Sequence, residues 1–329
     1  MPASQSLHEK IGKMKRIQIL LAVYNGEKYL REQLDSYLRL DNFEEVKILA
    51  RDDGSTDGSL KILDEYSEKY GIEVIKGKNI GLNANFHELI LARDRSCEYF
   101  AYSDQDDVWL ESKLSRAVTE LDKYHEDIPT LYAALSHITD ESLEIIGSIF
   151  CPTKELSFYN AIVQNVCAGH TEVCNAALMN LLEKKFSEGI YVTDHWTYML
   201  ASAVGRVVFD KTHTTLYRQH GKNVIGYTSN PIKNTLRRIK RVLTTRDAAS
   251  FSTQIAAFIE CYGDIIPKEF RAEACKFLDS QRNIFRRLGY IFTTKAYRHT
   301  PIESLIFRFM YIFGKYKVNN FYIKETTRL

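Results

Sequence analysis

Three carboxylates stand within four residues of the chain, at Asp104, Asp106 and Asp107. They follow the apolar run 97–102, whose aromatic content and length are typical of a buried strand. Carboxylates this close repel one another, so a counter-cation is the simplest way to keep them ionised. Oxygen ligands suit Mg²⁺ or Mn²⁺, which are usually shared with a substrate phosphate. The alternative interpretation is a solvated acidic loop before a helix that starts near Leu110.

Two more polar turns follow predicted strands nearer the N-terminus. The strand 17–23 ends at Tyr24, and the strand 45–50 leads into the turn 51–59, which is rich in Asp, Gly and Ser. Open α/β sheets bind their ligands at the carboxyl ends of the parallel strands. We therefore expect Tyr24 and Asp53 to lie on the same sheet edge as the three carboxylates.

Strands and helices alternate between these turns. Helices are expected over 29–40, 59–70 and 83–93, and strands over 72–75 and 98–103. This alternation predicts βαβ units and a mainly parallel sheet. The chain has no GxxxxGK[ST] segment and no GxGxxG after its first strand, which argues against a P-loop enzyme or an ordinary dinucleotide dehydrogenase. A site that holds a diphosphate through a metal and acidic residues remains.

These segments together resemble a known family. The ordered set AVYNG at 22–26, DDGSTD at 52–57 and SDQDDVW at 103–109 resembles the donor domain of glycosyltransferase family 2, which has the GT-A fold. With the later segments DHW at 194–196 and LYRQHGKNVIG, the form DQDDVW is similar to the bacterial rhamnosyltransferases of that family, which build cell-wall polysaccharides. The resemblance covers about residues 17–226, and it implies the roles that follow.

The resemblance implies a donor site at the shared sheet edge. Tyr24 would stack on the nucleobase, and Asp53 would accept a hydrogen bond from the N–H of a pyrimidine imide. Asp106 matches the family's metal ligand, and Asp104 matches the partner that contacts ribose or metal. A cation bridging the diphosphate would neutralise the charge that builds on the leaving nucleoside diphosphate. Asp107 could orient the other carboxylates by hydrogen bonds or cap the helix near residue 110, and we favour the cap.

The same resemblance assigns the chemistry of the second half. Asp194 is the predicted base, which takes the proton of the acceptor hydroxyl in an inverting transfer. An N-cap role is the alternative for this residue. Arg218 is predicted at the diphosphate and His220 as a further metal ligand. The related enzymes usually read His-Asp-Trp-Trp, whereas here His195 follows the aspartate.

An acceptor pocket is expected around Gly169 and His170, where the glycine would permit close approach of a sugar ring. Trp196 is assigned to the same pocket, although it could stack on a sugar face or fill the core. Asn83 could line the ribose or start a helix, and we favour the helix start.

Composition limits the class of protein. The 329 residues are 45% hydrophobic, which suffices for one large core or one core with an appended domain. No apolar run approaches the roughly 20 residues that span a bilayer. The six cysteines form no CxxC pair and no signal peptide is expected, so reduced thiols in a cytoplasm are the default.

The C-terminal hundred residues differ in charge from the rest. Residues 230–329 hold 19 Lys and Arg against 8 Asp and Glu, although the whole chain has a net charge of only +2. The segment 232–243 reads as a basic amphipathic helix, and 290–292 and 305–313 mix aromatics with cations as interfacial segments do. The predicted partner is a membrane surface. The competing interpretation is a helical hairpin that packs on the donor domain or on a second subunit of a homo-oligomer; no motif indicates nucleic acid.

We thus expect an α/β protein with the GT-A fold, a Rossmann-like, mainly parallel sheet flanked by helices, and an α-helical C-terminal region. A flexible tail (1–15) precedes a GT-A domain (16–228), with a donor half to about residue 110 and an acceptor half over 111–228, and a basic region (229–329) follows.

The expected reaction is inverting, metal-dependent transfer of L-rhamnose from dTDP-β-L-rhamnose to a lipid-linked saccharide at the cytoplasmic face of the cell membrane. The donor sugar rests on the resemblance alone. One alternative is a transferase that uses a UDP-hexose or UDP-N-acetylhexosamine. The other is an inactive, membrane-associated scaffold, which predicts decayed acidic motifs; Asp53, Asp104, Asp106 and Asp194 are nevertheless all present.

Overall fold

The structure, a computed structural model, describes residues 17–220 and 247–317 of the chain. The predicted tail over 1–15 and the predicted basic helix over 232–243 lie outside the described residues. So does the boundary predicted near residue 228. The division into domains therefore stays a prediction.

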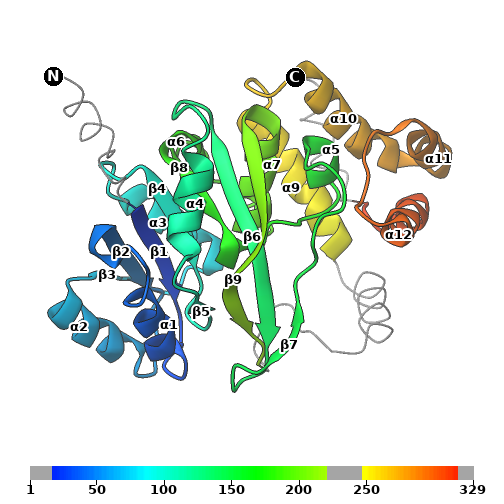
Figure 1. The fold of residues 1–329 in the computed structure, drawn as a ribbon. Helices are drawn as coiled ribbons and strands as arrows, with labels where there is room; N and C mark the ends of the chain where they lie inside the picture. The colour runs from blue at the N-terminus through cyan, green and yellow to red at the C-terminus, as the bar shows by residue number, and fades with distance from the viewer. Residues whose placement is uncertain (1–16, 221–246, 318–329) are drawn as a thin grey trace, which may run out of the picture.

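One sheet runs through the described residues and carries the other elements (Figure 1). Its strands are β1 (Ile17–Val23), β2 (Val46–Asp52), β3 (Glu73–Lys76), β4 (Tyr99–Ser103), β5 (Val108–Trp109), β6 (Thr130–Thr139), β7 (Ile145–Ser148), β8 (Val173–Asn175) and β9 (Arg206–Arg218). Their order is β3-β2-β1-β4-β8-β6-β9-β5, and β7 pairs with β6. The parallel arrangement predicted from the sequence holds for β3, β2, β1 and β4. In the second half β8 is antiparallel to both of its neighbours, so the sheet is mixed there.

Helices cover both faces of this sheet. They are α1 (Leu30–Tyr37), α2 (Ser59–Tyr70), α3 (Leu82–Ala92), α4 (Lys113–Leu121), α5 (Phe158–Ala161), α6 (Ala176–Glu183) and α7 (Thr193–Val204), with a 3-10 turn, η2, at Gly169–Thr171. Apolar side chains of α1, α2 and α4 form one buried cluster with the sheet. Those of α3, α6 and α7 form a second cluster on the opposite face. The sheet edge that carries the polar turns lies between the two.

The first strand shows why the donor half folds this way. All seven residues of β1 are buried, because helices cover the sheet on both faces. Its single polar residue is Gln18, which is fully buried, and its Oε1 accepts a hydrogen bond of 2.8 Å from the backbone N–H of Asp94. A continuous apolar run therefore marks a central parallel strand, as the sequence suggests.

The C-terminal helices extend the second cluster. They are α9 (Asp247–Tyr262), α10 (Lys268–Asp279), α11 (Ile284–Thr293) and α12 (Pro301–Ile312), drawn in yellow to red in Figure 1. Phe258 of α9 lies with its ring centroid 5.4 Å from that of Trp196 in α7 and 5.8 Å from that of Phe158 in α5. These helices share a core with the sheet. None of the described helices is long and apolar enough to cross a membrane.

The segment after the carboxylates departs from the prediction. Val108 and Trp109 form the short strand β5, which pairs with Leu216 and Thr215 of β9, and α4 begins only at Lys113. The indole of Trp109 is buried and packs edge-on against Tyr37 of α1, which holds the chain extended at this point. The prediction that Asp107 caps a helix near residue 110 is therefore wrong.

Candidate active site

The polar turns after β1, β2 and β4 meet at one sheet edge, as predicted. The side-chain amide of Gln105, from the acidic loop, accepts the N–H of Tyr24 at 2.7 Å and donates to its carbonyl at 2.9 Å. The backbone N–H of Asn25 donates to Ser55 Oγ at 2.9 Å, which joins the first turn to the second. Three segments far apart in sequence thus form one surface.

The predicted nucleobase residues differ in exposure. The Tyr24 ring is 45% exposed and free to be covered by a flat ligand. Asp53 is buried, and its carboxylate accepts hydrogen bonds from Arg51 Nη1 at 2.7 Å and from the backbone N–H groups of Ile80 and Gly81 at 3.0 Å each. Asp53 therefore organises the loop before α3. Its contact with a pyrimidine imide stays a prediction.

Asp106 and His220 come together from the ends of β4 and β9. His220 Nε2 lies 2.8 Å from Asp106 Oδ2, and the imidazole stacks on Tyr29 with ring centroids 5.0 Å apart. The sequence prediction assigned both residues to a cation. The described structure brings them within reach of one ion, because a carboxylate oxygen and an imidazole nitrogen already touch.

Arg218 lies beside this pair but faces the protein. Its Nε donates to the carbonyl of Asp106 at 3.1 Å, its Nη1 donates to the carbonyl of Glu141 at 2.5 Å, and its Nη2 pairs with Glu32. The side chain is almost completely buried. Its guanidinium therefore holds the end of β9 against the acidic loop, and the predicted phosphate contact would require these partners to be exchanged.

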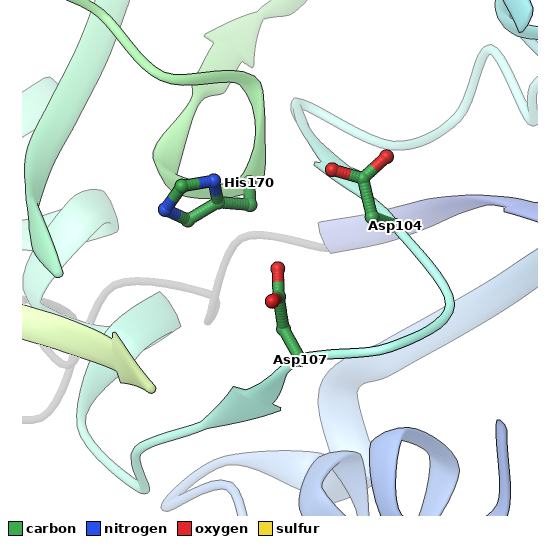
Figure 2. Close-up of side chains that lie close together, drawn as sticks. All are labelled: Asp104, Asp107 and His170. Carbon is green, nitrogen blue, oxygen red and sulfur yellow. The ribbon is translucent and has the colours of Figure 1, made fainter. Parts of the chain in front are cut away.

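A second group of ligands lies deeper, as Figure 2 shows. One oxygen each of Asp104 and Asp107 and one ring nitrogen of His170 all lie within 4.8 Å of one another, and the side chains converge on a common space. Asp107 Oδ2 is buried and has no hydrogen-bond partner among the described residues. A buried oxygen without a donor, among hard oxygen ligands, fits a divalent cation. Asp104 is shared between this group and the predicted set.

Burial sets the protonation of this deeper group. Burial, with the nearby charges of Asp106 and Asp194, raises the pKa of Asp104 to about 7. Burial, with the nearby charges of Asp106 and Asp104, raises the pKa of Asp107 well above its usual range. Without a cation these carboxyls retain protons near neutral pH, and binding of a cation would release them.

Lys113 lies behind the group as a buried amine. Its Nζ donates to the carbonyl of His170 at 2.6 Å and to Thr215 Oγ1 at 3.0 Å, and burial lowers its pKa to about 7. The His170 ring stacks on Tyr217 at 4.4 Å, and its Nε2 lies 2.8 Å from Ser136 Oγ. Burial and the Lys113 charge lower the pKa of His170 to about 3, so the imidazole is neutral and able to act as a ligand.

Asp194 lies at the start of α7, beside the 3-10 turn η2 that also carries His170. Its Oδ2 accepts the N–H of Gly169 at 3.0 Å and its Oδ1 accepts the N–H of His195 at 2.6 Å, while burial raises its pKa. A Cβ on Gly169 would lie 3.2 Å from Asp194 Cβ. The close approach that this glycine permits is therefore to Asp194. Asp194 does satisfy a backbone donor of the first turn, although the N-cap position itself is Val192.

Gln254 of α9 holds the chain in front of Asp194, and no sequence signal pointed to it. Its fully buried side chain accepts the N–H groups of Tyr191 at 2.8 Å and Val192 at 3.2 Å. Its Nε2 lies 2.8 Å from Nδ1 of His195, whose Nε2 lies 2.5 Å from the carbonyl of Ala161. A carbonyl only accepts, so the proton is on Nε2 and Nδ1 accepts from Gln254.

Asn83 holds the same segment from the donor half. Its Nδ2 donates to the carbonyls of Ile190 at 2.9 Å and Tyr191 at 3.1 Å, and its Oδ1 accepts from Thr193 Oγ1 at 3.1 Å. Asn83 lies in the first turn of α3, as the sequence predicts. The partners of Asn83 are more than a hundred residues away in the sequence, so these contacts could be found only from the fold.

The predicted acceptor residues are mostly internal. Trp196 is 2% exposed and packs against Phe258 and Tyr262, so of its two alternatives it fills the core and does not offer its face to a sugar. His170 is also buried, and it lies with the carboxylates. Gly169, the third of these residues, contacts Asp194.

Residues 18–171 match the family model described as Glycosyl transferase family 2. The chain is 27% identical over 230 residues to "dTDP-rhamnosyl transferase RfbG" of Shigella flexneri, a match that covers 63% of this chain and 73% of that protein. It is 34% identical over 114 residues to an uncharacterised protein of Mycobacterium tuberculosis. That match covers 33% of this chain and only 32% of the mycobacterial protein.

Solved structures share the fold. Residues 1–349 of Staphylococcus aureus TarS superimpose with a TM-score of 0.53 at 16% identity, covering 95% of this chain and 91% of that one. The Pyrobaculum calidifontis mannosyltransferase PcManGT, solved with GDP-Man and Mn²⁺, superimposes with a TM-score of 0.53 at 13% identity, covering 92% and 86%. At these identities the likeness concerns the fold alone.

Proposed function

We propose that this chain, whose residues 18–171 match the model of glycosyl transferase family 2, transfers a sugar from a nucleoside diphosphate donor to an acceptor hydroxyl with inversion. One observation carries the proposal: Gly169 donates its N–H to Asp194 Oδ2 at 3.0 Å, and the next residue, His170, has a ring nitrogen within 4.8 Å of oxygens of Asp104 and Asp107. A proton acceptor and a group of cation ligands therefore both lie beside η2. An inverting transfer requires both kinds of group at the reacting centre.

In this reaction the acceptor oxygen attacks the anomeric carbon from the face opposite the diphosphate. The bond from that carbon to the diphosphate oxygen breaks as the new C–O bond forms. Asp194 takes the acceptor proton, and its raised pKa brings it nearer to neutral pH, where a base works best. Its two backbone donors, from η2 and from the first turn of α7, orient the carboxylate.

The carboxylates after β4 would hold a divalent cation, Mg²⁺ or Mn²⁺. Asp104 and Asp106 with His220 form one ligand set, and Asp104 and Asp107 with His170 form the other. When bound, such a cation neutralises charge on the leaving diphosphate. Tyr24 stacks on the nucleobase from its exposed position, and Asp53 accepts a hydrogen bond from the N–H of the pyrimidine imide.

The proposed donor is dTDP-β-L-rhamnose. The similarity to the Shigella protein named dTDP-rhamnosyl transferase, over 63% of the chain, supports it. A UDP-N-acetylhexosamine is the second candidate, because a stretch of 116 residues is 26% identical to the S. aureus poly(ribitol-phosphate) β-N-acetylglucosaminyltransferase TarS. The acceptor we propose is a lipid-linked saccharide of cell-wall or capsular polysaccharide, met at the inner face of the cell membrane.

A donor panel tests the proposal. Titration calorimetry with dTDP, UDP and GDP, each with Mn²⁺ or with a chelator, measures which nucleobase is preferred and whether binding requires the metal. Transfer is then followed from dTDP-rhamnose, UDP-N-acetylglucosamine and UDP-glucose to lipid-linked acceptors. We expect dTDP to bind most tightly and only with the cation. A clear preference for UDP would replace the rhamnose donor by the second candidate.

The same experiment tests the scaffold alternative. A chain that binds none of the nucleotides, and neither transfers nor hydrolyses any donor, would contradict an enzymatic function. Nucleotide binding without transfer to any acceptor would leave the donor site in place and reject the proposed acceptor class.

A further inference from the structure

Two C-terminal helices expose an unusual amount of apolar surface. Its members are Ile284, Phe285, Phe292, Ile302, Leu305, Phe309 and Phe313, which we call the α11–α12 face. Phe285 and Phe292 are 81% and 83% exposed, and the α12 members are between 57% and 69% exposed. Elsewhere in the described part of the chain no large apolar side chain exceeds 57%. Contiguous apolar surface of this kind marks an interaction site.

The spacing along α12 and just past its end produces a stripe. Residues 302, 305, 309 and 313 follow at intervals of three and four, so they line one side of the helix. Phe307, Met310 and Tyr311 lie on the other side and are buried in the core. The helix is therefore apolar on both sides, whereas a helix that only covers a globular core is polar on its outer side.

The two helices run side by side in opposite directions. The rings of Tyr290 and Tyr311 lie 4.7 Å apart, and Arg287 Nη1 lies 2.0 Å from where a Cβ of Gly314 would be. Residues near the start of α11 thus neighbour those just after α12. This pairing puts Phe292 roughly level with Phe309, so the exposed rings of both helices belong to one region. Figure 1 shows both helices at the end of the molecule away from α1 and α2.

Charge distinguishes the kinds of partner for this face. Residues 284–317 contain seven Lys and Arg and a single Glu. That glutamate, Glu303, is directed inward, where its carboxylate accepts from Gln164 and Thr300. Arg308, Lys315 and Lys317 are exposed beside the phenylalanines. Two copies packed through this face would bring their cations together, which opposes association. An anionic surface has the complementary charge.

We propose that the α11–α12 face docks on the surface of an anionic lipid bilayer. The phenylalanines enter the boundary between headgroups and acyl chains, and the neighbouring cations contact lipid phosphates. The long Arg and Lys side chains can reach the phosphates while their apolar stems remain among the acyl chains. The inference stands apart from the proposed transfer reaction, although such docking would bring the enzyme to a lipid-linked acceptor.

Vesicle flotation of the full chain tests this docking. The vesicles are phosphatidylcholine alone or phosphatidylcholine mixed equally with phosphatidylglycerol. We expect binding to the anionic vesicles only, and weaker binding in high salt. Replacing both rings in Phe292→Ser/Phe309→Ser should weaken binding by about tenfold or more, from the apolar area withdrawn from lipid. Arg308→Glu/Lys315→Glu should abolish the preference for anionic vesicles.

A matched control replaces exposed apolar residues elsewhere, in Ile145→Ser/Phe186→Ser, and should bind vesicles as the parent does. Thermal unfolding by circular dichroism checks that all variants are folded, and light scattering reports their oligomeric state. Binding unchanged in both α11–α12 variants would overturn the proposal. So would a parent dimer that Phe292→Ser/Phe309→Ser dissociates without any effect on vesicles. Donor hydrolysis in solution should be equal in all variants, so a failure of docking and a failure of the transfer reaction are told apart.

Discussion

The acidic loop after β4 and the start of α7 both carry carboxylates close to η2, but hydrogen bonds hold the two kinds of carboxylate differently. Asp194 receives two backbone N–H donors, from Gly169 and His195. Asp107 receives one, from Arg218, and its second oxygen has no donor among the described residues. Asp104 has acidic neighbours that contribute to its raised pKa.

This difference indicates a difference in role. A carboxylate with fixed donors keeps one orientation and can take a proton without moving, as a base must. Carboxylates that lack donors and crowd one another gain most from a shared cation. We therefore propose that the loop provides the cation ligands and that the helix provides the base.

The largest effect is expected from Asp194→Asn. The amide keeps the shape but cannot accept the acceptor proton, so kcat should fall by about 10³-fold while donor affinity is retained. Steady-state transfer measures kcat, and nucleotide titration measures the donor affinity. Asp127→Asn is the control, because the Asp127 side chain is 87% exposed. If Asp194→Asn loses donor affinity and kcat to the same extent, the residue acts as a donor or cation ligand, like the acidic loop, and not as the base.

A smaller loss, on the order of 10²-fold in transfer, is expected when a cation ligand is removed. Asp106→Asn and Asp107→Asn separate the two ligand sets, since each set contains only one of them. The measurement is Mn²⁺ affinity by electron paramagnetic resonance, with transfer measured in parallel. We expect Asp106→Asn to weaken Mn²⁺ binding more, as the family resemblance implies. The reverse order would assign the cation to Asp107 and His170.

Stability should depend on pH through Asp104. Its folded pKa of about 7 lies above the usual value, so the folded state binds the extra proton between about pH 4 and 7 and loses stability as pH rises through that range. Relative to Asp104→Asn, the parent should lose on the order of 2 kcal/mol over this range in a chelator, by urea unfolding. Saturating Mn²⁺ should reverse the trend. A parent and variant with parallel pH profiles would contradict it.

The smallest effect on turnover is expected from Gln254→Leu. It leaves the N–H groups of Tyr191 and Val192 without their acceptor, which should cost about 1–3 kcal/mol of stability. Because the segment before Asp194 loosens, kcat should fall by about fivefold with donor KM unchanged. Gln254→Glu, which restores the acceptor, should recover part of kcat. Thr253→Ala, which alters only a bond within α9, is the control.

The donor half was largely predictable from the sequence. Its strands, the order of its helices and the meeting of Tyr24 with the acidic loop follow from local patterns, because an apolar run between turn residues has few other structures available. Asp194 at a helix start also follows from its neighbours in sequence.

Contacts between distant segments were decided only by the tertiary structure. Trp196 could have faced a sugar or the core, and the arrival of Phe258 from α9 determines that it is core. Arg218 was expected to face a phosphate, but Glu32 and Glu141 surround it. Gln254 carries no signal at all, because its role exists only once α9 packs beside α7. Local sequence determines which backbone forms, whereas the partner of a buried polar group depends on which segments the packed core brings within hydrogen-bonding distance.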